Sequence, residues 1–68
     1  MNIDVIGYNA GLVWTALNGA EALGLKQIKK VTKLKDKEVY AAIGWLAREG
    51  KILIAENEDA KDLVISLA

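Results

Sequence analysis

The chain has 68 residues with nine basic and nine acidic side chains, and it contains neither His nor Cys. A disulfide framework is therefore excluded, a metal site would need carboxylates alone, and the zero net charge gives no overall attraction to nucleic acid. A chain of this length forms one domain, over residues 1–68, and buries only about 60% of its unfolded surface. We expect no cofactor and no small-molecule ligand.

Apolar residues are in excess. Together, 40 of the 68 residues, or about 59%, are Ala, Val, Ile, Leu, Met, Trp or Gly. In ordinary soluble domains the apolar share is about 45–50%. Small domains without disulfides or metals depend on good packing or on oligomerisation, so the excess predicts a homodimer. The N-terminus lacks the basic stretch of a signal peptide, and the uncharged stretch 5–20 is too short for a membrane span. We expect a complete small cytoplasmic protein that begins at Met1.

The first predicted element is a helix that Asp4 caps and that runs to about Gly19. Its spacing of apolar residues predicts a core side made of Ile6, Ala10, Val13, Leu17 and Ala20.

The same helix has two further surfaces. Gly7, Gly11 and Thr15 lie on one stripe, which predicts a groove that another backbone can approach closely. Val5, Leu12 and Ala16 form an apolar strip on the other side of the core face. The helix therefore has more apolar surface than a three-helix core needs.

A short extended piece around residues 24–25 leads into a second helix in "KQIKKVTKL", with Ile28 and Val31 inward and a turn over residues 32–35. Asp36 is expected to cap a third helix, which Gly50 ends. The third helix has a clear core side, made of Val39, Ala42, Ile43 and Leu46.

After Gly50 the apolar period changes from 3.6 to 2. "KILIAE" and "DLVISL" are predicted strands, joined by the five-residue hairpin loop "NEDAK". Helix, short strand, helix, turn, helix and hairpin is the order of a winged helix-turn-helix domain, an α+β fold.

Two stretches carry a resemblance to a known family. "IGYNAGLVW" in the first helix and "AIGWLAREGKI" in the third resemble small bacterial winged helix-turn-helix proteins that stand alone as single domains and have no assigned function. The resemblance covers nearly the whole chain. It implies a winged-helix fold and a homodimer, and it implies no ligand.

The outward face of the third helix carries Lys37, Ala41, Gly44 and Arg48, with Trp45 beside them. In a DNA-binding relative this face enters the major groove. Base reading needs Arg, Lys, Asn, Gln, Ser or Thr, and here two small residues occupy the middle. Lys37 and Arg48 suit phosphates, which position a protein without specifying a sequence. We expect weak sequence specificity.

A cluster of lysines precedes and overlaps this helix, with Asp36 as its one acid. The second helix and the turn lie against the DNA backbone in this fold, so the cluster suits phosphates; a solvated helix face is the equal alternative. The wing tip is surrounded by four acidic residues, which the phosphates of DNA would repel: Glu56, Glu58, Asp59 and Asp62. The nucleic-acid candidates are Lys26, Lys29, Lys30, Lys33, Lys35, Lys37 and Arg48.

Trp14 and Trp45 fall at the edges of their core faces, and Tyr40 flanks the third helix. Each Trp either caps the core, Trp45 against the wing, or anchors a protein interface, where Trp is enriched; Tyr40 is equally open. The interface candidates are Val5, Gly7, Gly11, Leu12, Trp14, Tyr40, Ala41, Gly44 and Trp45.

Catalysis is not expected, because Ser66, the one Ser, has no base to activate it. The sequence predicts a DNA-binding protein with a regulatory role in transcription that no motif assigns. The alternative is a homodimeric protein-interaction module on a winged-helix scaffold that does not read DNA.

Overall fold

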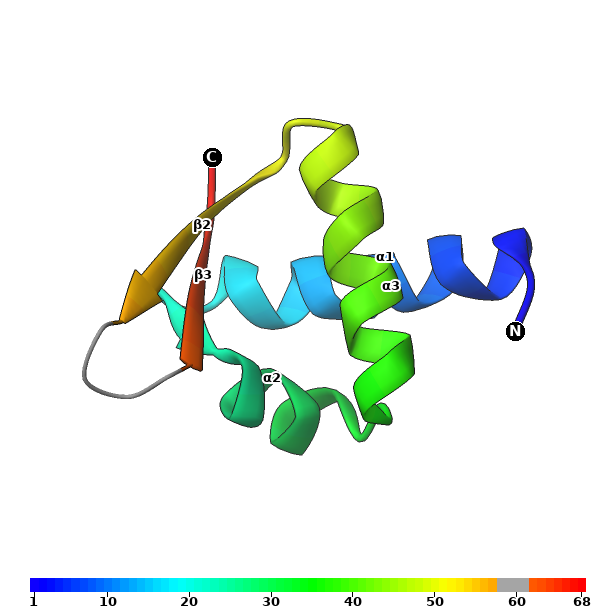
Figure 1. Ribbon diagram of the computed structural model, residues 1–68, viewed down its shortest axis with the longest axis horizontal. Coiled ribbons are helices and arrows are strands. Elements are labelled where there is room, and N and C mark those ends of the chain that lie inside the picture. Colours follow the sequence, from blue (N-terminus) through cyan, green and yellow to red (C-terminus); the bar gives the residue numbers. More distant parts are fainter. Residues whose placement is uncertain (58–61) are drawn as a thin grey trace.

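The computed structural model describes residues 1–57 and 62–68. The elements follow in the order α1 (Ile3–Asn18), β1 (Leu23–Gly24), α2 (Leu25–Thr32), α3 (Asp36–Arg48), β2 (Ile52–Asn57) and β3 (Asp62–Leu67). This order confirms the α+β winged helix-turn-helix fold. Most of the predicted loop "NEDAK" lies outside the described residues. In Figure 1, α3 crosses α1, the N-terminal turns of α1 extend past α3, and the hairpin lies at the other end of α1.

The N-termini of α1 and α3 differ from the prediction by one or two residues. Asn2, not Asp4, caps α1, because its extended backbone lets Oδ1 accept a hydrogen bond from the Val5 N–H at 2.9 Å. Asp4 lies inside the first turn, where a carboxylate favours the positive end of the helix. Asp36 is also inside its helix, and Lys35 is the N-cap. Both predicted caps were therefore wrong.

Gly50 ends α3 as predicted. Its φ of +71° lies in the left-handed region, which Gly adopts without strain. The Gly50 N–H donates to the Ala47 carbonyl and the Lys51 N–H to the Leu46 carbonyl, both at 3.0 Å. This pair of bonds satisfies two of the free carbonyls of the last turn, and the chain then continues into β2.

The core lies where the three helices meet the inner face of the sheet. The whole predicted core side of α3 is buried, and so are Ala10, Val13, Leu17 and Ile28, while Ile6 is half-buried. Two predictions were wrong. Ala20 is exposed because α1 ends at Asn18, and the Val31 side chain is 61% exposed. Leu25 at the start of α2 is buried instead.

Among the described residues, one polar side chain is buried in this core. Asn9 on α1 is 4% exposed, and its Nδ2 has no hydrogen-bond partner among the described residues. A buried donor without a partner costs about 1–3 kcal/mol. The pattern of apolar residues gave no sign of it.

The sheet has the strand order β1-β3-β2, and both pairs are antiparallel. Ile65 in the central strand faces Leu23 on one side and Ile54 on the other, and it is fully buried. Side chains alternate along a strand, so Ile52 points to the core while Leu53 points outward. No helix among the described residues is long and apolar enough to cross a membrane.

Candidate nucleic-acid interface

The outward face of α3 is arranged as the sequence predicts. Lys37, Gly44 and Arg48 are exposed, and Ala41 is half-buried between them. Arg48 follows Lys37 by eleven positions, so their backbones lie about 16 Å apart along the helix. A Cβ added at Gly44 would meet nothing within 4 Å among the described residues. The face therefore has a cation at each end and a smooth, shallow middle.

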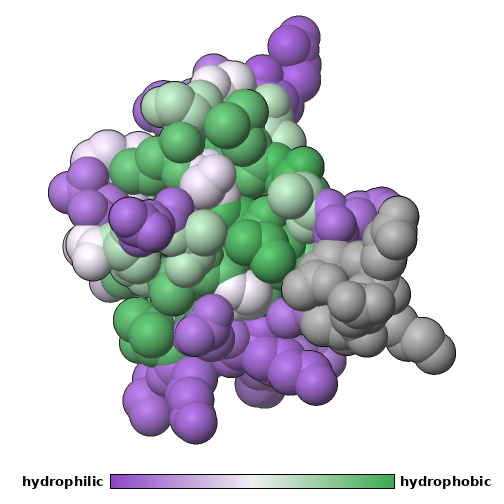
Figure 2. Space-filling model, turned by 90° about the vertical axis from the view of Figure 1, so that its left-hand side faces the viewer, coloured by the Kyte–Doolittle hydropathy of each residue, from purple (hydrophilic) through white to green (hydrophobic). Residues whose placement is uncertain are grey.

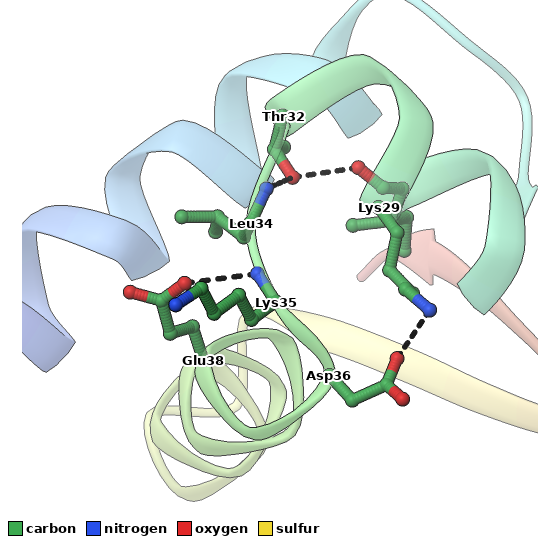
Figure 3. A network of polar contacts seen from close by, with 7 residues as sticks. Lys29, Thr32, Leu34, Lys35, Asp36 and Glu38 are labelled. Carbon is green, nitrogen blue, oxygen red and sulfur yellow. Dashed lines mark hydrogen bonds and ion pairs between the residues drawn. The ribbon is translucent and has the colours of Figure 1, made fainter.

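The turn between α2 and α3 is held by a short network of hydrogen bonds (Figure 3). The Thr32 hydroxyl donates to the Ile28 carbonyl at 2.6 Å and accepts from the Leu34 N–H at 3.3 Å. Glu38 Oε1 accepts from the Lys35 N–H at 2.8 Å. Leu34 packs against the core, and in Figure 3 its side chain points toward α1. The network fixes the angle at which α3 leaves the turn.

Sequence reasoning missed Thr32 and Glu38 as the residues that fix this turn. The spacing of Lys35 and Glu38 is a signal that could have found the second, since a Glu three residues after the N-cap typically accepts from the N-cap N–H. Lys33 takes a left-handed conformation at the end of α2, with φ of 64°, which places its side chain at the corner between the two helices.

Lys29 differs from the other lysines of the cluster because it forms an ion pair with Asp36 that joins α2 to the start of α3. The pair neutralises the one acid of the cluster. Lys26, Lys30, Lys33, Lys35 and Lys37 are exposed and make no ion pair with the described part of the chain. Arg48 has none there either.

Two of the four predicted wing acids, Glu56 and Asp62, lie at the loop end of the hairpin. Glu58 and Asp59 lie outside the described residues, and Glu56 is exposed near the end of β2. Asp62 is half-buried and turned toward α2: its Oδ2 lies 2.7 Å from the position that a Cβ of Gly24 would take. Asp62 pairs with Asn57 at the loop end of the hairpin, and because Gly24 is the N-cap of α2, its carboxylate also lies beside the positive end of a helix.

A groove of about 470 Å³ opens between α1 and the C-terminal half of α3. Trp45 is half-buried and packs against the core, with its ring 3.5 Å from the position of a Gly7 Cβ. The sequence placed Trp45 against the wing; the structure places its ring over α1 instead. The predicted stripe is thus covered at Gly7 by the chain itself and open at Gly11.

The residues around the groove join apolar and charged groups. Trp14 is 38% exposed beside Gly11, and Thr15 donates its hydroxyl proton to the Gly11 carbonyl at 2.9 Å. Glu49 and Lys51 line the same groove, and Lys51 Nζ lies 3.8 Å from Glu49 Oε1. The groove brings four of the interface candidates together, Gly7, Gly11, Trp14 and Trp45. The candidates Val5, Leu12 and Tyr40 do not line it; Val5 and Tyr40 are exposed and Leu12 is half-buried.

The chain is similar to known proteins over nearly its whole length. A family model described as "Winged helix-turn-helix domain (DUF2582)" matches residues 1–67. The uncharacterized protein MJ1608 of Methanocaldococcus jannaschii is 40% identical over an alignment that covers 91% of this chain and 89% of that protein. The solution NMR structure of protein BT2368 from Bacteroides thetaiotaomicron has a TM-score of 0.85 and 33% identity, over 98% of this chain and 79% of that one.

Two further solved structures, one of them of a transcriptional regulator, share the fold at low identity. PcaV from Streptomyces coelicolor, in complex with its natural ligand, has a TM-score of 0.78 and 13% identity. The match covers 100% of this chain and 45% of that one. The MarR variant C80S from E. coli, complexed with operator DNA, has a TM-score of 0.76 and 14% identity, over 100% of this chain and 46% of that one. At these identities the likeness concerns the fold alone.

Proposed function

The chain belongs to the winged helix-turn-helix family DUF2582, and from that premise we propose that it binds duplex DNA through the phosphate backbone, with weak preference for base sequence. The role is that of a small cytoplasmic regulator of transcription. The MarR structure with operator DNA supports the proposal at the level of the fold.

The observation that carries the proposal is the distribution of charge around α3. Six cations without an ion pair among the described residues lie on α2, on the turn and at the two ends of the outward face of α3, in a chain whose net charge is zero. Cations on these elements would neutralise phosphates of the DNA backbone. Such neutralisation supplies most of the sequence-independent affinity of a protein for DNA.

Weak specificity follows from the middle of the same face. Direct readout needs side chains that reach base edges in the major groove, and Ala41 and Gly44 offer none. The helix also contains no Asn, Gln, Ser or Thr. Lys37 and Arg48 stand about 16 Å apart, as expected for contacts with phosphates on either side of a groove rather than with adjacent bases.

A single charge reversal tests the proposal. Lys30→Glu and the control Lys51→Glu each change the net charge by the same amount at an exposed lysine, but Lys51 forms an ion pair with Glu49 and is not one of the six cations. Fluorescence anisotropy with a short duplex at low salt should show a several-fold loss of affinity for Lys30→Glu and a salt slope smaller by about 1. Equal effects of both variants, or no binding by the unaltered protein, would refute the proposal.

A second candidate function is supported by the groove beside Gly11. A protein-interaction module, which the sequence predicts to be homodimeric, would use the open part of the stripe and the exposed edge of Trp14. Gly11→Leu should then fill the groove and lower the solution mass of the complex. Gly19→Leu is the matched control, because a Cβ there also meets nothing within 4 Å of the described residues and Gly19 does not line the groove. Equal masses for both variants would contradict this role for α1.

A further inference from the structure

β2 is an edge strand whose outer side carries unused backbone groups. In the order β1-β3-β2, no strand pairs with the far side of β2 among the described residues. The Lys51 carbonyl accepts from the Ala68 N–H at 3.0 Å, and the register continues through Leu53 with Ser66 and Ala55 with Val64. Since bonded and non-bonded pairs alternate in an antiparallel ladder, the N–H and C=O groups of Ile52, Ile54 and Glu56 point away from β3.

This edge lacks the features that normally keep edge strands apart. Proteins protect edges with Pro, with a charge in the middle of the strand or with a bulge. β2 has no Pro, its pairing runs without interruption from Ile52 to Asn57, and no charged residue lies between Lys51 and Glu56. Leu53 is 61% and Ile54 46% exposed. Figure 2 shows the side of the molecule that carries the hairpin, where apolar residues form a broad surface.

We propose that two copies of this chain associate by antiparallel pairing of β2 with β2 of the second copy, which joins the two three-stranded sheets into one. The contact is separate from the groove at Gly11, and it depends on neither proposed function. It would place two α3 helices at a fixed spacing in one particle.

Symmetry restricts the register of this contact. A two-fold axis maps each hydrogen-bonded pair of the new ladder onto another hydrogen-bonded pair. Hydrogen-bonded and non-hydrogen-bonded pairs alternate along the ladder, and only residues with outward backbone groups can form the bonded pairs. The axis must therefore pass through a position where one residue faces its own copy. With Leu53 at the centre, Leu53 faces Leu53 of the second copy and Ile52 faces Ile54 on either side. With Ile54 at the centre, Glu56 would face Ile52. The register centred on Leu53 is therefore the one in which the three central pairs join apolar residues only.

Charge is compatible with the antiparallel arrangement. In the register centred on Leu53, Lys51 faces Ala55 and Glu56 faces Gly50 of the second copy, so like charges do not meet. Parallel strands in register would bring like charges together. Two chains of zero net charge have no overall repulsion to overcome.

The contact is short, so its affinity should be low. Stable interfaces bury about 1,200 Å² or more in total. The proposed pairing of two β2 strands buries less than that, because each copy contributes only two exposed apolar side chains, Leu53 and Ile54. We expect monomer at low micromolar concentration and a growing dimer fraction toward millimolar concentration.

A cysteine scan tests both the contact and its register, because the chain has no cysteine of its own. In the proposed register Leu53 forms a non-bonded pair with its copy, at a Cα separation of about 4.5 Å, which a disulfide can bridge. Leu53→Cys should give a covalent dimer after mild oxidation at high concentration. Ala55→Cys is the matched control on the same exposed face, because its two copies would be about 13 Å apart.

The outcomes separate the possible contacts. Cross-linking of Ala55→Cys in preference to Leu53→Cys would overturn the register, and a dimer by sedimentation without cross-linking at residue 53 would return the contact to the groove at Gly11. A monomer at every concentration would overturn self-association altogether. In a cysteine-free background, Leu53→Lys should abolish the dimer while Tyr8→Lys, at the 69% exposed Tyr8 of α1, leaves it intact.

Discussion

Replacement of Gly44 by Ala tests whether the middle of the α3 face is free. Gly44 lies inside the helix, and a Cβ there meets nothing within 4 Å among the described residues. Gly in a helix interior costs about 1 kcal/mol relative to Ala. Gly44→Ala should therefore raise the free energy of unfolding by about 1 kcal/mol, which for a domain of this size raises Tm by about 4–8 °C.

Urea denaturation followed by circular dichroism measures the change in stability. Gly50→Ala is the control with the opposite sign, because the φ of +71° at Gly50 costs a residue with a side chain about 1–2 kcal/mol. A loss of stability in Gly44→Ala would show that the α3 face is packed against something, which contradicts the description of this face as open.

The same variant tests the mode of DNA binding. If the ends of the face contact phosphates and its middle reads nothing, one added methyl group should leave the affinity for duplex DNA unchanged within about twofold. A large loss of affinity in a protein of normal or raised stability would show that the α3 backbone approaches the DNA closely at Gly44, and would refute the account of weak specificity.

Three further substitutions test separate parts of the structure. Asn9→Leu removes the buried amide whose Nδ2 has no partner in the described structure and should stabilise the protein by about 1–2 kcal/mol; a loss in urea denaturation would show that Asn9 has a partner. Asn2→Ala removes the cap of α1 and should cost about 1 kcal/mol, whereas Asp4→Asn should cost less; the reverse order would restore Asp4 as the cap. Lys29→Gln should weaken DNA binding less than Lys30→Gln, since Lys29 already pairs with Asp36, and equal losses by anisotropy would count against that assignment.

The sequence predicted the architecture well where apolar periodicity is long. α3 has thirteen residues, and its four predicted core residues are all buried. α2 has eight residues and begins at Leu25, one residue earlier than predicted. Its inward side is therefore set by Leu25 and Ile28, which turns Val31 to the surface. Thr32 is tolerated next to the core because its hydroxyl bonds to the Ile28 carbonyl.

Features that depend on contacts between elements could not be predicted. Hydrophobic patterns assign polar residues to the surface, so Asn9 was missed. The ion pair of Lys29 with Asp36, the turn of Asp62 toward Gly24 and the ring of Trp45 over Gly7 depend on angles between elements, which spacing along one helix does not contain. The exposed edge of β2 is of the same kind, because strand order decides which side of a strand stays free.

The central claim is that this chain holds DNA by its phosphates and reads little sequence. A titration of two duplexes of unrelated sequence, across a range of salt concentrations, tests it most directly. With six exposed cations free of ion pairs in the described structure and a slope of about −0.9 for each phosphate contact, log K should fall steeply with log salt, with a slope no steeper than about −5 and equal for both duplexes. Absence of binding at low salt, or a strong preference for one duplex, would contradict the claim.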